Sequence, residues 1–202
     1  MVTRCVTGTG TASSRGRLTV WGLLPLSHTK RINADGILVA MKLFHGTNIS
    51  IEKPRIVIPN RALDFGAGFY LTSDILQAER WARLVVLRAS KGMPIIHEYH
   101  FDLGFLSKLR VLKFETASKE WLDFVCDHRL ENYEGDSFDL IIGPVANDRT
   151  MQIVQAYMNA SDRNLYLPVA LHDIKPENLS DQFVFKSEKA LEALELINVR
   201  QL

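Results

Sequence analysis

The hydrophobic and polar positions of this 202-residue chain follow helical spacing in some segments and strand-like alternation in others. Helical spacing is clearest between Asp74 and Ala89, where apolar residues recur every three or four positions. Asp74 is placed to cap the start of this helix, and Gln77, three residues later, completes a capping box. Gly92 and Pro94 predict where the helix ends.

The same patterns predict the other elements. Short apolar runs predict strands at Lys42–His45, Phe69–Leu71, Ile95–Phe101, Phe138–Ile142 and Gln182–Phe185. Further helices are expected from Ser118, over Met151–Met158, and from Glu188 to about Ile197 with Ser187 as its cap. Residues 51–58 contain Pro54, which favours an edge strand or a loop. Because strands and helices are interspersed without a regular βαβ rhythm, the sequence predicts the α+β class with mostly antiparallel sheets.

The first forty residues differ from the rest. Met1–Gly16 is rich in Thr, Ser, Gly and Arg and has no apolar period. Val20–Leu26 is a short apolar run behind a long polar segment, which is not the layout of a secretory signal. Strand-like patterning begins only at Met41. We therefore expect residues 1–40 to be a poorly ordered extension or to lie upstream of the natural start, and residues 41–202 to form one domain.

Composition narrows the classes of function. Lys and Arg number 24 against 23 Asp and Glu, a net charge of +1, so the chain has no general attraction to nucleic acid or anionic lipid. Cys5 and Cys126 have no zinc-site spacing and cannot form a disulfide framework, which favours a reducing, cytoplasmic compartment. His97 and His100, three apart in a predicted strand, point to opposite faces, so no metal is expected. No apolar run reaches the roughly 18 residues of a membrane span.

Two motifs concentrate residues suited to binding. His45-Gly46-Thr47 follows a predicted strand, where a histidine can bond a ligand hydroxyl and a glycine admits a ligand to the backbone, although an isolated motif of this kind is more often a turn. Gly66-Ala67-Gly68 precedes Phe69 and Tyr70, whose side chains point to opposite faces, one to the core and one to a cleft. Trp81, eleven residues later, either packs in the core or joins Tyr70 in stacking on a flat heterocycle.

In order and spacing, the segments HGT, DFGAGFYLT, QAERWA and DQFVFKSEKAL resemble the His-Tyr-Glu type of the ADP-ribosyltransferase superfamily. The resemblance is closest to an uncharacterised bacterial branch found near toxin–antitoxin and anti-phage genes, and it spans Met41 to about Ile197. It implies a split sandwich of two small antiparallel sheets with flanking helices, and NAD as the substrate. By the same resemblance, His45 holds the 2′-hydroxyl of the nicotinamide ribose, Gly46 meets the carboxamide, and Tyr70 and Trp81 stack on the ring.

The sequence departs from this family at its catalytic glutamate, whose position is held by Gln182. Glutamine can hydrogen-bond, but it carries no charge to stabilise a developing cation and cannot act as a base. Three outcomes stay open: transfer to an acceptor that brings its own nucleophile, which we favour; recruitment of Asp181 or Glu188; or NAD binding without chemistry.

A polar turn, Asn147-Asp148-Arg149, follows the predicted strand at Phe138–Ile142. Arg149 is suited to grip a phosphate through two parallel hydrogen bonds, and Asn147 or Asp148 to order the acceptor, although a plain helix cap explains the turn about as well. The superfamily also contains RNA 2′-phosphate transferases, but Tyr70 and the scarcity of matching histidines disfavour that class.

Taken together, the resemblance implies a cytoplasmic, NAD-dependent mono-ADP-ribosyltransferase that acts as a toxin or defence effector. Its acceptor is unspecified, and an antitoxin protein is the implied partner. The alternative is a catalytically degenerate module that binds NAD or ADP-ribose.

Overall fold

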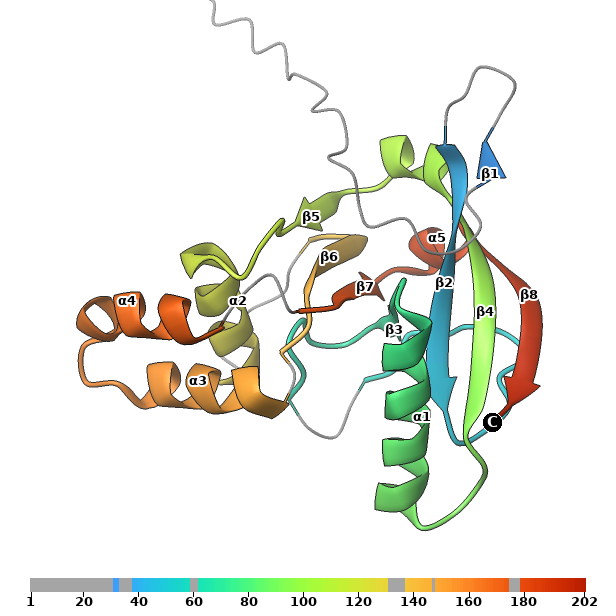
Figure 1. Ribbon diagram of the computed structural model, residues 1–202. Helices are drawn as coiled ribbons and strands as arrows, with labels where there is room; N and C mark the ends of the chain where they lie inside the picture. Colours follow the sequence, from blue (N-terminus) through green and yellow to red (C-terminus); the bar gives the residue numbers. More distant parts are fainter. Residues whose placement is uncertain (1–30, 33–37, 59–61, 131–136, 147, 175–178) are drawn as a thin grey trace, which may run out of the picture.

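The structure is a computed structural model that describes residues 31–32, 38–58, 62–130, 137–146, 148–174 and 179–202. In these residues the strands form two four-stranded sheets, and helices lie on the outer faces of both (Figure 1). This arrangement confirms the predicted α+β class and the two small sheets. No helix in the described part of the chain is both long and apolar enough to cross a membrane.

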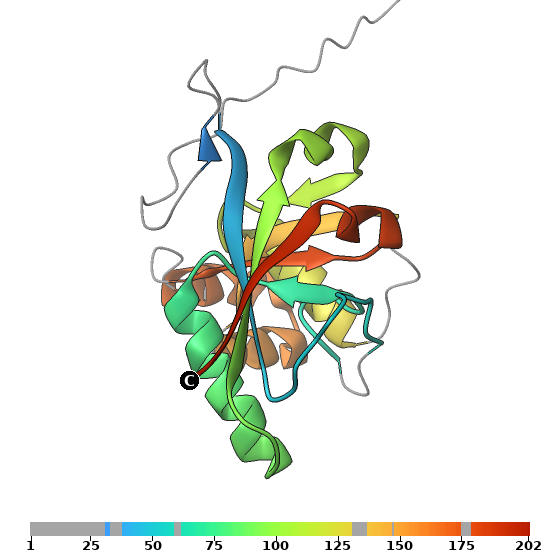
Figure 2. The same ribbon diagram turned by 90° about the vertical axis from the view of Figure 1, so that its right-hand side faces the viewer.

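The first sheet is antiparallel throughout and has the order β1-β2-β4-β8. Its strands are β1 (Arg31–Ile32), β2 (Leu38–Thr47), β4 (Ile95–Asp102) and β8 (Leu194–Gln201). Helix α1 (Ile75–Ala89) runs along its outer face, as Figures 1 and 2 show from two directions. Phe44 and Ile96 of the sheet pack there against Ala78 and Ala82 of the helix.

The second sheet has the order β3-β7-β6-β5, formed by β3 (Phe69–Leu71), β7 (Asp181–Phe185), β6 (Leu140–Pro144) and β5 (Val111–Lys113). The β5–β6 pair is parallel, which the expectation of antiparallel sheets did not include. Helices α2 (Lys119–Arg129), α3 (Asp148–Asn159) and α4 (Arg163–Ile174) gather on the side away from the first sheet (Figure 1). The remaining helical turns are η1 (Leu103–Lys108) and α5 (Glu188–Leu191).

Two apolar clusters hold these layers together. The first fills the space between the sheets and includes Leu43, Tyr99, Phe101, Phe69, Phe183 and Phe185. The second lies between the second sheet and its helices and includes Trp121, Val125, Ile141, Tyr157 and Val184. Alternate residues of β7 therefore face opposite clusters, as the period of a strand requires.

The backbones of the two sheets meet at one isolated bridge. Phe44 of β2 and Thr72, just after β3, exchange both amide-to-carbonyl hydrogen bonds, at 2.8 and 3.0 Å. Beyond this pair the strands diverge. The second sheet therefore leaves the first sheet at this point instead of extending it.

The predicted last helix is wrong. Only one turn, α5, forms after the Ser187 cap, and residues 194–201 then pair with β4 as strand β8. Leu194 and Leu196 point to the core between the sheets, and Ile197 and Val199 are β-branched, so strand pairing outweighs helical propensity beyond α5.

Helix α4 was not predicted, because Pro168 lies inside it. Proline removes the amide that would bond the carbonyl of Asn164 and normally argues against a helix. Asp162 compensates at the start of the helix by accepting hydrogen bonds from the amides of Asn164 and Leu165.

The α1 cap is confirmed, since Asp74 accepts hydrogen bonds from the amides of Leu76 and Gln77. The predicted capping box is wrong, because the side chain of Gln77 reaches across to the carbonyl of Asp181.

The expectation of little order before residue 40 falls largely on residues 1–30 and 33–37, which lie outside the described part of the chain. Within the described residues, β1 pairs Arg31 with Ala40, and β2 already begins at Leu38. A strand therefore crosses the domain boundary that was predicted at Met41.

Gly46 provides a test of the packing between α1 and β2. A Cβ atom at this position would overlap the carbonyl oxygen of Ala78 and press on the amide of Ala82. We expect Gly46→Ala to lower the free energy of unfolding by at least about 2 kcal/mol, because the obstructing atoms are backbone. Urea denaturation will measure this loss. Gly104→Ala, which meets only the side chain of Asp102, is the matched control and should cost much less. Equal losses of unfolding free energy in the two variants would contradict the close packing of Gly46 against the backbone of α1.

Candidate active site

His45 links the two sheets beside the isolated bridge. It lies on the inner face of β2, where its ring stacks on Phe69 with 4.6 Å between centroids, and its Nδ1 lies 2.7 Å from the carbonyl oxygen of Tyr70. A carbonyl can only accept, so Nδ1 carries the proton and Nε2 keeps its lone pair. Burial, opposed by the hydrogen bond to the Tyr70 carbonyl and reinforced by nearby His97, lowers the pKa of His45 to about 4. At neutral pH His45 is therefore an uncharged group with a hydrogen-bond acceptor at Nε2.

Gly46 borders the point where the strands diverge. Continuation of the Phe44–Thr72 register would place Gly46 opposite Tyr70, but the bridge is isolated and the Tyr70 carbonyl meets the side chain of His45. Backbone groups two residues apart in a strand point the same way, so the N–H and C=O of Gly46 point toward this gap as those of Phe44 point toward Thr72. A strand edge of this kind presents one donor and one acceptor, the complement of a primary carboxamide.

Tyr70 is partly buried and packs against the cluster between the second sheet and its helices. Its hydroxyl donates to the carbonyl of Gly66 at 2.7 Å and accepts from the amide of Phe65 at 3.3 Å. Phe69 occupies the opposite face and is almost fully buried, which confirms that the two aromatic side chains diverge. The Tyr70 hydroxyl therefore fixes the loop at Phe65 and Gly66.

Gln182 lies on the same face of the second sheet as Tyr70, and only 4% of it is exposed. Its amide nitrogen donates to the carbonyl of Pro144 at 3.1 Å and to Asp64 Oδ2 at 3.4 Å. These two bonds use both amide hydrogens and leave the oxygen as the remaining hydrogen-bonding atom.

Asp64 is a site residue that the sequence analysis missed. It is buried, its Oδ1 forms an ion pair with Arg129 at the end of α2, and its Oδ2 accepts from the Ala146 amide at 3.1 Å. The only signal in the sequence is its place at the head of the glycine-rich DFGAG turn. The side chains of Gln182 and Arg129 thus bond to Asp64, and the hydroxyl of Tyr70 bonds to the amide of its neighbour Phe65.

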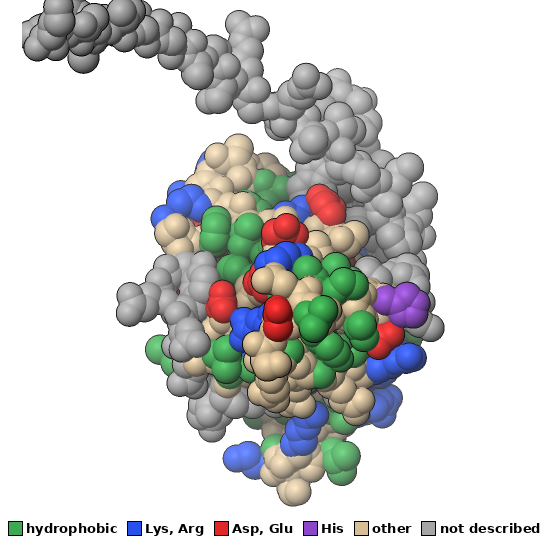
Figure 3. Space-filling model, turned by 90° about the vertical axis from the view of Figure 1, so that its left-hand side faces the viewer, with side chains coloured by type: hydrophobic (Ala, Val, Ile, Leu, Met, Phe, Trp, Pro, Cys, Tyr) green, Lys and Arg blue, Asp and Glu red, His purple; other side chains and the backbone are tan. Residues whose placement is uncertain are grey.

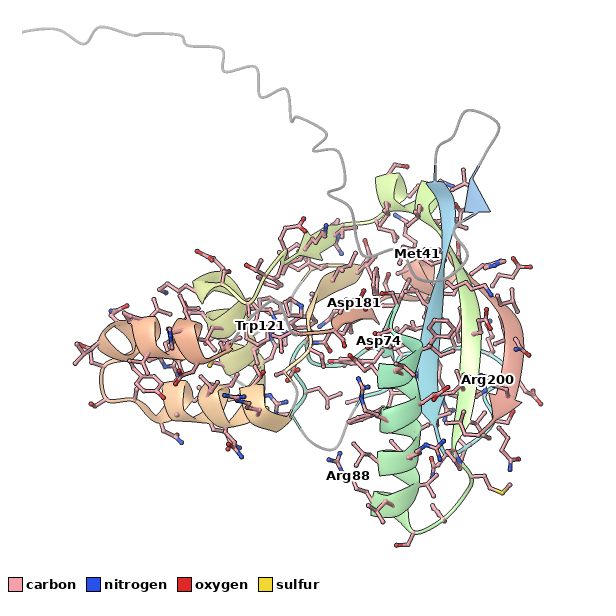
Figure 4. The ribbon with its side chains drawn as sticks, in the orientation of Figure 1. Met41, Asp74, Arg88, Trp121, Asp181 and Arg200 are labelled. Carbon is pink, nitrogen blue, oxygen red and sulfur yellow. The ribbon has the colours of Figure 1, made fainter. Side chains whose placement is uncertain are left out.

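Trp81 lies on the flank of α1 that also carries Gln77 and Arg88. It is 41% exposed, and the Arg88 guanidinium lies 5.5 Å from its ring centroid. Figure 4 shows Arg88 projecting from α1 on the side of the α2–α4 helices. Trp81 is therefore partly exposed and is not a core residue.

The remaining predicted residues have mixed placements. Thr47 is buried, and its hydroxyl accepts from the amide of Ile49 at 3.5 Å, while a Cβ at Gly68 would collide with Val184. Both therefore serve local packing. Arg149 is exposed in the first turn of α3. Asn147 lies outside the described residues.

Of the two carboxylates considered as substitutes for glutamate, Asp181 has other partners. Asp181 points to the face opposite Gln182 and accepts from the Thr72 hydroxyl, the Ser73 amide and the Ser73 hydroxyl. It lies beside Asp74 at the start of α1 (Figure 4). Glu188 is exposed in the first turn of α5.

His97 and His100 lie on opposite faces of β4, as predicted. His97 is fully buried and its Nε2 accepts from the Ile51 amide at 2.9 Å, whereas His100 lies 4.0 Å from Glu195. The Nδ1 of His97 and the hydroxyl of Tyr99 have no hydrogen-bond partner among the described residues. In that part of the chain no group of three or more His, Cys, Asp or Glu side chains could hold a metal ion.

The fold and these contacts define an α+β domain in which His45 joins the two sheets, while Tyr70 and buried Gln182 lie on the helix-facing side of the second sheet. The chain belongs to a family described as a protein of unknown function, DUF3990, whose model matches residues 41–196. No curated protein and no solved structure matches the chain.

The contact between Gln182 and Asp64 gives a physical reason for glutamine at this position. A glutamate would set a second carboxylate against buried Asp64, and like charges at this distance in a buried site repel strongly. We expect Gln182→Glu to lower the free energy of unfolding by about 2 kcal/mol at pH 7. Thermal and urea denaturation will measure the loss.

The reciprocal double variant is the control. In Gln182→Glu with Asp64→Asn, the amide and the carboxylate exchange places and Arg129 keeps an acidic neighbour. We expect this pair to recover at least half of the stability that Gln182→Glu loses. Additive losses would show that the two side chains do not interact.

The pKa of His45 also predicts how stability depends on pH. Burial lowers the pKa of His97 as well, so both histidines take up protons more readily in the unfolded chain. The stabilisation is complete above pH 6.5 and is lost as the pH falls from 6.5 toward 4. Between pH 7 and pH 5, His45→Gln should lose about 1–2 kcal/mol less stability than the wild type. Urea denaturation at both pH values will test this, with His172→Gln on the surface as the control. If His45→Gln loses as much stability between pH 7 and pH 5 as the wild type does, the lowered pKa of His45 is contradicted.

Proposed function

We propose that this protein is a cytoplasmic NAD-dependent mono-ADP-ribosyltransferase whose site lies at the junction of the two sheets. The observation that carries the proposal is the contact between His45 and the Tyr70 carbonyl, which fixes a neutral histidine beside an edge of Gly46 that pairs with no strand in the described part of the chain. The motif order from His45 to Gln182 and the two-sheet fold add support.

The gap beside Gly46 suits the nicotinamide carboxamide. The Gly46 amide donates to the carboxamide oxygen, and the Gly46 carbonyl accepts from the carboxamide nitrogen. His45 Nε2 accepts a hydrogen bond from a ribose hydroxyl. Because burial keeps this imidazole uncharged, it places no positive charge next to the pyridinium.

Stacking and orientation accelerate the proposed reaction. In this proposal the pyridinium ring stacks on Tyr70 and Trp81, both of which are partly exposed. The bond between C1′ and the nicotinamide nitrogen breaks, and nicotinamide leaves with the electron pair. The acceptor nucleophile then bonds to C1′ and loses a proton. With Gln182 in place of glutamate, the acceptor supplies its own nucleophile, and the Gln182 oxygen offers a hydrogen bond but no charge.

A second candidate function is a module that binds NAD or ADP-ribose without turning it over. The burial of Gln182 favours it, because both amide hydrogens are used inside the protein and neighbouring Asp64 is neutralised by Arg129. A toxin or defence role with an antitoxin partner is part of the first proposal and rests on the family resemblance alone.

Incubation of the full chain with NAD tests the proposal. We expect nicotinamide release, measured by chromatography, and ADP-ribose added to protein, nucleic acid or small molecules in expressing cells, measured by mass spectrometry. His45→Ala should reduce release at least about a hundredfold and Trp81→Ala at least about tenfold, since each removes a contact to the nicotinamide half.

The matched controls are His100→Ala on the same sheet and Leu87→Ala on the same helix, which should release nicotinamide as the wild type does. Tight NAD binding by calorimetry without release would favour the binding module. If neither NAD nor ADP-ribose binds, both candidate functions are excluded.

A further inference from the structure

The last turns of α1 and the turn that follows them form a protruding end of the molecule, which we call the α1 tip (residues 83–94). Figures 1 and 2 show from two directions that the end of α1 projects beyond both sheets. Leu87, on the helix, is 73% exposed there, and Met93, in the turn, is 48% exposed. Two large apolar side chains therefore lie where the protein would first touch a flat surface.

Contacts with the rest of the domain hold the turn of the α1 tip in place. The Asn48 side-chain amide donates to the carbonyl of Lys91 at 3.1 Å, and the Pro94 carbonyl accepts from the Leu202 amide at 2.9 Å. Gly92, with a φ of +79°, lies so close to the Asn48 carbonyl that a Cβ atom would overlap it. The apolar side chains of the tip are thus presented on an ordered backbone, which reduces the entropy lost when another surface covers them.

The α1 tip is also basic. Arg83, Arg88 and Lys91 are exposed, and residues 80–94 contain no Asp or Glu. Glu79, the only acidic residue within α1, forms an ion pair with an arginine of β8. Among the described residues, the three cations of the tip therefore form no ion pair. Figure 3 shows blue Lys and Arg side chains beside a hydrophobic one at the lower end of the molecule, where α1 ends.

This uncompensated charge distinguishes the tip from other parts of the surface. Lys42, Lys113 and Lys119 each lie against a carboxylate. The net charge of +1 is an average over the chain and does not describe the tip, where positive charge and apolar surface coincide.

We propose that the α1 tip docks the protein on an anionic membrane surface. Leu87 and Met93 enter the boundary between the head groups and the acyl chains, and the three cations lie at the level of the lipid phosphates. The docking is peripheral and reversible. It goes beyond NAD chemistry and uses no residue to which the proposed reaction assigns a role.

The aliphatic side chains favour a lipid surface over a nucleic acid. Phosphates of either partner attract the cations, but a nucleic acid offers Leu87 and Met93 no hydrocarbon in which to insert. Proteins that bind single strands enclose the backbone in a basic groove, whereas a protruding end contacts a plane.

Cosedimentation of the full chain with lipid vesicles tests the proposal. We expect binding to phosphatidylcholine vesicles that contain about 30% phosphatidylserine to be at least about tenfold stronger than binding to phosphatidylcholine alone. Arg83→Gln with Lys91→Gln should lower the partition coefficient on the anionic vesicles at least about tenfold. Leu87→Ser should lower it at least about threefold, because an inserted leucine is lost.

Two matched controls should bind as the wild type does. Lys108→Gln with Arg110→Gln removes the same two charges at exposed positions away from the tip, and Leu76→Ser changes an exposed leucine at the other end of α1. Circular dichroism will check that every variant folds.

The proposal is overturned if the two kinds of vesicle bind equally, or if the controls weaken binding as much as the tip variants do. Fluorescence anisotropy with a single-stranded RNA at the same salt concentration tests the other polyanion. Tighter binding to RNA than to the anionic vesicles, weakened by the Arg83 and Lys91 substitutions but not by Leu87→Ser, would also overturn it.

Discussion

The hydrogen bond from His45 to the Tyr70 carbonyl is the contact on which the rest of the arrangement depends. The backbones of the two sheets are joined only at Phe44 and Thr72 among the described residues, so a side chain must bridge the next position. The imidazole does this while stacked on Phe69, in the apolar layer between the sheets. Burial keeps it neutral, and neutrality leaves one nitrogen to donate to the protein and one to accept from a ligand.

Around this contact, polar side chains from both ends of the chain converge on a short turn. Tyr70, Gln182 and Arg129 all bond to Asp64 or to its neighbour Phe65. Buried polar groups are costly unless each has a partner, so this network favours one arrangement of β3, β6, β7 and α2. The same network engages both hydrogens of the Gln182 amide and leaves its oxygen as the remaining hydrogen-bonding atom.

Helix caps and short apolar runs in the sequence correctly predicted the helices and strands in which they occur. Asp74 and Ser118 cap their helices, and the Phe69–Leu71 strand has the predicted bounds, because caps and apolar runs act within a few residues. The prediction of the last helix was wrong because β8 pairs with β4, whose residues lie 93 to 106 positions earlier, and such pairing leaves no local pattern. Helix α4 was missed because Pro168 is tolerated there, at the cost of one hydrogen bond. Of the candidate site, His45, Tyr70 and Gln182 were predicted from the resemblance. Asp64 was not, because a buried ion pair joining residues 64 and 129 has no sequence signature.

The single backbone bridge at Phe44 and Thr72 also sets how thick a group the junction can admit. The His45 ring, bonded to the Tyr70 carbonyl, spans the separation of the strands just beyond the bridge, and in the proposed function a flat amide enters this gap edge-on. A ligand with a bulkier substituent must first separate the two strands and break the two hydrogen bonds of the bridge, which costs about 1–3 kcal/mol of binding free energy. For the proposed nicotinamide ligand, this cost corresponds to discrimination of about ten- to a hundredfold against analogues with a bulkier substituent, without any side chain that contacts the substituent.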